Sequence, residues 1–161
     1  MLSFASDLGP NSNALVLFVT ENYEYKDKNK ILSKELVKKI DLFLKSLKEK
    51  SNKEEISSFD ISDKKKCFII KVKNKYENYY FEELGGSFFT YIKNYKTINS
   101  VDIYTDSLNG NKDKLSKLFS EFIFGFNLKS YTFNKYKTLN KEKINRKVDY
   151  KIISSNKKNI E

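Results

Sequence analysis

Residues Leu115–Lys137 read LSKLFSEFIFGFNLKSYTFNKYK, and their pattern underlies the predicted architecture. The first half spaces apolar side chains three and four residues apart, which predicts an amphipathic helix. The residues on this apolar stripe are Leu115, Leu118, Phe119, Phe122 and Phe126. From Ser130 the helical spacing stops, and an aromatic and basic segment runs to Lys137. We expect the phenylalanines of the stripe to be core residues rather than a cofactor site.

Strands and helices are predicted to alternate along the rest of the chain. The apolar runs Ala14–Val19 and Cys67–Val72 are typical of central strands that are covered on both faces. Shorter strands are predicted at residues 2–5, 56–59, 101–104 and 148–153, with 2–5 at an edge. One helix follows the capping residue Ser33, another covers residues 77–95, and Asn111 or Asp113 caps the helix described above. This order predicts an α/β fold with a largely parallel sheet.

The pair Gly85-Gly86 lies inside the predicted helix 77–95. Two glycines there either form a phosphate-binding loop or allow the helix to approach a strand closely. No G-x-G-x-x-G frame surrounds them, so we favour the packing interpretation.

Composition limits the function classes. The 161 residues suit one domain, and 31 basic against 21 acidic side chains give a net charge of +10. Such a charge attracts nucleic acid, with Lys64–Lys66 and Lys141–Lys147 as candidate clusters. However, Arg146 is the only arginine, and arginine is the residue that grips phosphate with two hydrogen bonds. We therefore keep nucleic-acid binding as an alternative that is not favoured.

The chain has one cysteine, Cys67, and no histidine. Cys67 precedes an apolar run, so we interpret it as a small buried hydrophobe. A lone cysteine forms no internal disulfide, which fits a reducing compartment. The absence of histidine excludes zinc sites of the Cys/His type and histidine-dependent catalytic triads. The N-terminus lacks signal-peptide features, and Ala14–Val19 is too short to cross a membrane, so we expect a soluble, cytoplasmic protein without a membrane partner.

Carboxylates occur in pairs at Glu54-Glu55, at Glu82-Glu83, and at Asp102 with Asp106. Paired acids can bind a metal or share proton transfer, but they also occur commonly on solvated surfaces. We favour the surface interpretation for each pair. No residue is therefore assigned a catalytic, cofactor-binding or metal-binding role, and the chain does not look like an independent enzyme.

Three segments resemble the N-terminal domain of the leucyl (cytosol) aminopeptidase family of metallopeptidases. They are Asn13–Val19 after a short first strand, Leu84–Lys93 with its paired glycine, and Phe124–Lys137, where a helix end runs into Ser-Tyr-x-Phe-x-x-Tyr-Lys. The last is the most specific, and the resemblance spans essentially the whole chain.

The resemblance implies a three-layer, macro-domain-like α/β fold, with a mixed and mostly parallel sheet of about six strands flanked by helices. It implies a non-catalytic N-terminal domain over residues 1–153, with 154–161 beginning a linker towards a C-terminal peptidase domain. In that family the second domain carries two divalent metals, manganese or zinc, and the protein is a hexamer that releases N-terminal residues from peptides. None of that domain's metal-binding or catalytic motifs occurs in this chain.

The macro-like architecture also leaves a small-molecule alternative. α/β folds place ligands at the carboxyl ends of their strands, where ADP-ribose or another nucleotide would bind. The sequence offers no convincing phosphate loop for such a ligand.

Overall fold

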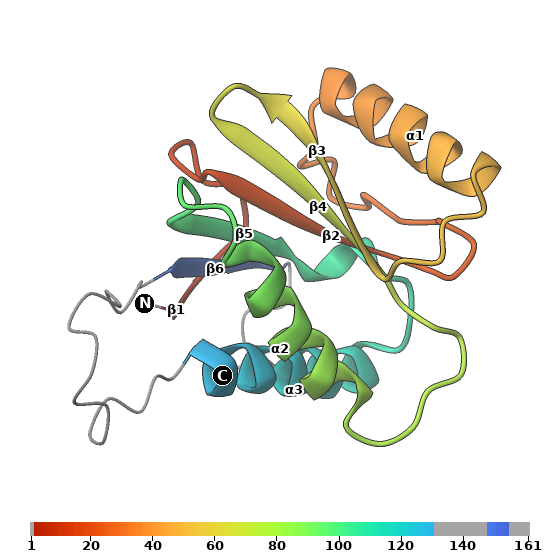
Figure 1. Ribbon diagram of the computed structural model, residues 1–161, viewed down its shortest axis with the longest axis vertical. Coiled ribbons are helices and arrows are strands. Elements are labelled where there is room, and N and C mark those ends of the chain that lie inside the picture. The colour runs from red at the N-terminus through yellow and green to blue at the C-terminus, as the bar shows by residue number, and fades with distance from the viewer. Residues whose placement is uncertain (1, 131–147, 155–161) are drawn as a thin grey trace.

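The computed structural model describes residues 2–130 and 148–154 (Figure 1). The strands are β1 (Leu2–Ala5), β2 (Ala14–Val19), β3 (Ile56–Ser62), β4 (Lys65–Lys71), β5 (Ser100–Tyr104) and β6 (Asp149–Ile153). The helices are α1 (Lys34–Glu49), α2 (Tyr80–Ile92) and α3 (Lys112–Ser130), with a short 3₁₀ turn η1 (Thr105–Ser107) after β5. Every strand and helix predicted from the sequence within this part of the chain is present.

The strands form one six-stranded sheet in the order β1-β6-β5-β2-β4-β3. All neighbouring pairs are parallel except β3 with β4, which are antiparallel and joined by a tight connection. This confirms the mostly parallel sheet and places β1 at an edge, as predicted. β2 lies between β4 and β5 in the middle of the sheet, and all six of its residues are buried.

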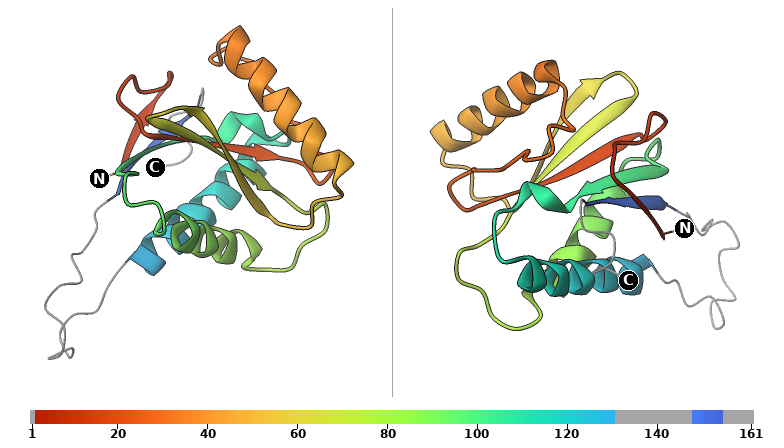
Figure 2. Two further views of the ribbon diagram at one scale, coloured as in Figure 1. Left: turned by 45° about the horizontal axis from the view of Figure 1, so that its top comes forward. Right: turned by 180° about the vertical axis from the view of Figure 1, so that it is seen from behind.

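Helices cover both faces of the sheet, so the molecule has three layers (Figures 1 and 2). α1 packs on one face through Leu36, Ile40, Leu44 and Leu47. α2 and α3 pack side by side on the opposite face. Alternate residues of β2 serve the two cores: Leu15 and Leu17 face α1, whereas Val16 and Phe18 face α2 and α3. This alternation is the two-residue period of a strand that is buried on both faces.

The core beneath α2 and α3 is rich in aromatic rings. Phe18 makes edge contacts with Phe119 and Phe122, at 4.8 and 5.2 Å between ring centroids. Phe126 continues the cluster towards Tyr150 of β6, at 5.2 Å. Three of the four phenylalanines of α3, namely Phe119, Phe122 and Phe126, are therefore core residues, as the helical spacing predicted.

Gly85 is a packing residue, but its neighbour is a helix and not the strand we expected. A Cβ on Gly85 would overlap the backbone carbonyl of Phe122 in α3, and a Cβ on Gly125 would overlap that of Glu82 in α2. The two glycines thus let the helix backbones touch. Gly86 is not part of this close contact, because the nearest neighbour of a Cβ at that position would be 3.7 Å away.

Several predicted boundaries shift for local reasons. α2 begins at Tyr80, not near residue 77, because Tyr79 holds a left-handed backbone with φ 69° that cannot continue a helix. Ser33 caps α1 as predicted, its side chain accepting a hydrogen bond from the Leu36 amide. Asn111, not Asp113, caps α3, since its side chain accepts from the amides of Asp113 and Lys114.

The aromatic and basic segment 131–137, the Lys141–Lys147 cluster and residues 155–161 of the predicted linker lie outside the described residues. Within the described ranges, no helix combines the length and apolar character needed to traverse a bilayer.

Candidate functional site

In this topology, the usual place for a ligand to bind lies between the carboxyl ends of β2 and β5. The chain leaves β2 towards α1 on one face and leaves β5 towards α3 on the other. In open α/β sheets, ligands bind in the crevice where neighbouring strands send their connections to opposite faces. We call this place the β2–β5 crevice; it is bordered by residues 20–33 after β2 and 105–111 after β5.

Backbone groups of the two loops are hydrogen-bonded across the β2–β5 crevice. The Lys26 amide donates to the carbonyl of Ser107 at 2.8 Å. The Phe18 amide donates to the Ser107 hydroxyl at 2.9 Å, and that hydroxyl donates to the carbonyl of Tyr104. Ser107 has no exposed surface. It therefore occupies the junction that a ligand would need to enter.

Side chains add a second set of links. The Tyr104 hydroxyl donates to Oδ1 of Asp27 at 2.9 Å, and the Asp27 carboxylate also accepts from the amides of Ile31 and Leu32. The Asn29 side chain donates to Asp106 at 3.1 Å. The first loop is thus tied to β5 and η1 by groups that would have to separate before a ligand could bind.

The surroundings of the Tyr104 phenol do not suit proton transfer. Burial raises the pKa of Tyr104, and the hydrogen bond to Asp27 and the charges of Asp27 and Asp106 raise it further. The phenol therefore stays protonated and acts as a hydrogen-bond donor. It is not poised as a base or a nucleophile.

A small cavity remains between the loops that border the crevice, on the side of β4 and against the start of α3. It has a volume of about 170 Å³. Its lining includes Thr20, Lys73, Asn74, Gly110 and Lys114. Sites for drug-sized ligands and cofactors usually enclose roughly 300–1,000 Å³, so this cavity is too small for a whole dinucleotide.

The carboxylate pairs singled out in the sequence do not form sites. Asp102 and Asp106 have different partners: Asp102 accepts from the Gly9 amide at 2.8 Å, and Asp106 accepts from Asn29 and Ser154. Glu55 forms an ion pair with Lys73 at 2.8 Å. Glu83 is exposed and Glu82 half-buried in the first turn of α2. Across the described ranges, no group of three or more acidic or cysteine side chains is placed to hold a metal ion.

Asp102 is the titratable residue whose environment the sequence did not reveal. It is 1% exposed, and its Oδ1 atom has no hydrogen-bond partner among the described residues. Burial raises its pKa, while the Gly9 amide and the charges of Lys65 and Lys151 act in the opposite direction. Cys67 is fully buried, as expected, and burial raises the pKa of its thiol, so it is unreactive.

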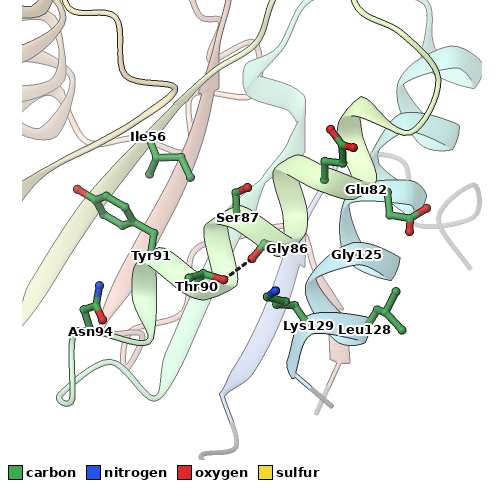
Figure 3. Close-up of a pocket in the computed structure, with 11 residues that line it drawn as sticks. Ile56, Glu82, Gly86, Ser87, Thr90, Tyr91, Asn94, Gly125, Leu128 and Lys129 are labelled. Atoms are coloured by element: carbon green, nitrogen blue, oxygen red, sulfur yellow. Dashed lines mark hydrogen bonds between the residues drawn. The ribbon is translucent and has the colours of Figure 1, made fainter. Parts of the chain in front are cut away.

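A larger hollow lies elsewhere, on the outer surface of the α2–α3 layer (Figure 3). We call it the α2–α3 groove; its volume is about 780 Å³. It is lined by Ile56, Glu82, Glu83, Gly86, Ser87, Thr90, Tyr91, Asn94, Gly125, Leu128 and Lys129. The sequence singled out Gly86, Glu82 and Glu83 but did not predict the groove, because its walls come from a strand and two helices that are distant along the chain.

Comparison with known proteins supports the fold but not a family. No family model and no curated protein sequence matches the chain. A solved structure of a tomato leucine aminopeptidase mutant matches with a TM-score of 0.65 and 14% identity, over 95% of this chain and 32% of that one. The chain thus spans about a third of the tomato enzyme's length.

Two macrodomains match over nearly their whole length. The macrodomain of Thermus aquaticus DarG has a TM-score of 0.63 and 13% identity, covering 96% of this chain and 98% of that one. The macrodomain of Mycobacterium tuberculosis DarG has a TM-score of 0.65 and 12% identity, covering 95% and 97%. The predicted macro-domain-like α/β fold is therefore confirmed. At these identities the likeness extends to the fold alone.

Proposed function

We propose that this chain is a non-catalytic accessory domain of a leucyl aminopeptidase, in which a separate peptidase domain of the same protein cleaves the peptide. The observation that carries the proposal is the closed β2–β5 crevice. The side chains of Tyr104, Ser107 and Asn29 hydrogen-bond to the opposite loop, to β2 or to β5. In a domain that binds a ligand there, these groups would be free for the ligand. Such a domain serves assembly or substrate access instead of chemistry.

In this proposal the metals belong to the other domain. Two divalent ions, manganese or zinc, would polarise the scissile carbonyl and activate a water there. The described residues of this chain do not fit that role, since they bring together no cluster of metal ligands. The full protein would be a cytoplasmic hexamer acting on peptides.

Two measurements test the accessory role. The purified 161-residue chain should fold and yet hydrolyse no leucyl p-nitroanilide, with or without added manganese or zinc. Metal-dependent turnover by this chain alone would contradict the proposal. The reading frame should also continue beyond Glu161 into a metal-binding peptidase domain, and a stop codon directly after Glu161 would contradict the proposed partner.

A second candidate is a macro-like module that binds ADP-ribose or a related nucleotide. The near-complete overlap with two macrodomains favours it. Binding would require the β2–β5 crevice to open, which breaks the link from Tyr104 to Asp27 and the link from Asn29 to Asp106.

Calorimetry distinguishes the two candidates. For an accessory domain we expect no heat with ADP-ribose, either for the natural chain or for a double variant, Tyr104→Phe with Asn29→Ala, that loosens the closure. Heat that appears or increases in the double variant would favour the nucleotide-binding candidate. Such a result would mean that closure competes with the ligand.

A further inference from the structure

Residues 6–12, which we call the strap, connect β1 to β2 and cover part of the sheet on the α1 face (Figure 1). Leu8 packs against the core beneath α1. The Gly9 amide donates a hydrogen bond to Oδ2 of Asp102 in β5, at 2.8 Å. Within the part of the chain that the structure describes, this is the only hydrogen bond that ties residues 6–11 to the sheet.

The carboxylate that holds the strap is buried and only half satisfied. Asp102 lies opposite Leu15 of β2, whose side chain faces α1, so both residues are on that face of the sheet. Asp102 is 1% exposed, and its Oδ1 atom has no hydrogen-bond partner among the described residues. The hydroxyl of Ser12, the last residue of the strap, donates to the carbonyl of Ala14. A buried acceptor without a donor costs free energy, so the closed strap leaves the carboxylate short of one partner.

A second donor for this carboxylate lies next to the strap. Lys151 of β6 is in register with Asp102 and therefore on the same face of the sheet. A Cβ on Gly9 would be 2.7 Å from Nζ of Lys151 and 3.3 Å from Oδ1 of Asp102. Gly9 thus lies against both the ammonium group and the carboxylate. Burial raises the pKa of Asp102, and Lys151 is among the charges that lower it, so the ammonium already acts on this carboxyl group.

The two ends of the strap are fixed independently of Gly9. At one end, the carbonyl of Ala5 accepts from the amide of Ser154 at 3.2 Å. At the other end, the amide of Asn13 donates to the carbonyl of Ser100 at 3.0 Å. The segment between these points can therefore move while β1 and β2 stay in the sheet.

We propose that the strap has a second, open state, in which Gly9 withdraws from Asp102 and the Lys151 ammonium forms an ion pair with the carboxylate. The closed state keeps the Gly9 hydrogen bond and the packing of Leu8. The open state exchanges them for a charge-assisted pair that also supplies a donor to the carboxylate. Lys151 and the strap thus compete for one acceptor. The inference does not depend on the proposed accessory role.

Amide hydrogen exchange of the 161-residue chain, followed by NMR, tests the competition. In the natural chain the Gly9 amide should exchange faster than the Phe18 amide in β2, because the strap opens without global unfolding. Lys151→Met should slow exchange at Gly9 by about two- to fivefold, since it removes an ion pair that stabilises the open state. Asp102→Ala should speed it by about tenfold or more, because the strap then loses its bond to a charged group.

Lys65→Met is the matched control. The charge of Lys65 also acts on Asp102, but its ammonium is not among the three atoms nearest to a Cβ on Gly9. This variant should leave exchange at Gly9 unchanged, and the Asn13 amide should keep its rate in every variant. Circular dichroism checks that each variant is folded.

Three results would overturn the inference. Exchange at Gly9 that is as slow as at Phe18 would mean that the strap does not open by itself. Exchange that Lys151→Met speeds or leaves unchanged would mean that Lys151 does not compete with the strap. Equal slowing by Lys65→Met and Lys151→Met would mean that the lysines act only through their electric field.

Discussion

The two faces of the sheet differ in the side chains that pack on them. On the α2–α3 face, aromatic rings such as Phe18, Phe122 and Phe126 pack against one another. On the α1 face, a single helix covers β2 and β4, and polar groups such as Asp27 and Asp102 join the loops to the sheet. Both faces have an apolar core, but aromatic rings dominate the core under α2 and α3, whereas aliphatic side chains and loop hydrogen bonds share the α1 face. Changes on the two faces should therefore differ in size and in pH dependence.

The largest effect is expected from a truncation in the aromatic core. Phe122→Ala removes a fully buried ring that contacts Phe18 and Phe88, and such truncations cost about 3–5 kcal/mol. Phe43→Ala is the comparison on the α1 face, where the ring is half-buried against Phe59. It should cost less than half as much in urea unfolding, and equal losses would remove the distinction between the faces.

The next effect comes from the glycine contact between α2 and α3. Gly85→Ala places a methyl group against the Phe122 carbonyl, and because the clash is with backbone, we expect a loss of about 2–3 kcal/mol. Gly86→Ala is the adjacent control, because a Cβ there would make only ordinary van der Waals contacts, the nearest at 3.7 Å. It should stabilise the chain by about 0.5–1 kcal/mol through helix propensity, seen as a higher midpoint of thermal unfolding.

A smaller loss is expected from opening the β2–β5 crevice. Tyr104→Phe removes a hydrogen bond to a carboxylate, which should cost about 2 kcal/mol. Tyr150→Phe on the other face removes a bond to the neutral amide of Asn127 and should cost about 1 kcal/mol. Urea denaturation of the two variants measures the difference, and a Tyr104→Phe variant as stable as the natural chain would show that the closure contributes little.

The smallest effect should appear at Asp102, as a change in pH dependence. Because the folded state raises the pKa of this carboxyl, folding favours its protonated form. Its contribution to stability is therefore fully present below the ordinary carboxyl pKa of about 3.9 and is lost as the pH rises through the folded-state value. Asp102→Asn keeps an acceptor for the Gly9 amide but does not titrate.

Urea midpoints at about pH 4 and about pH 7.5 test this expectation. The stability of Asp102→Asn relative to the natural chain should improve at the higher pH. Asp106→Asn serves as the control, since Asp106 lies at the loop and has hydrogen-bonding partners. A relative stability of Asp102→Asn that falls with rising pH would mean that Lys65 and Lys151 outweigh the burial of the carboxyl.

Much of the fold could be predicted from local patterns. The apolar run of β2 and the spacing of phenylalanines in α3 follow from burial. Buried positions recur with the period of the strand or helix, so they can be recognised in the sequence. The start of α2 could not be predicted, because the left-handed backbone of Tyr79 leaves no mark in residue type. The helix that contacts Gly85 could not be predicted either, because a glycine indicates a close approach but not which element makes it.

The candidate site was harder to predict than the fold. The sequence showed Asp27, Tyr104 and Ser107 as unrelated polar residues in separate segments. Only the crossing of the chain from β2 to α1 and from β5 to α3 brings their loops together. The α2–α3 groove likewise requires Ile56, Gly86 and Leu128 to meet from three elements.

By itself, the sequence determined the elements, the mostly parallel sheet and the two-sided burial of its central strands, because hydrophobic periodicity is a local property of the chain. The tertiary structure decided that hydrogen bonds join the loops of the β2–β5 crevice and that a groove lies on the α2–α3 layer. These features depend on distances between segments far apart in sequence, and no local pattern encodes such distances.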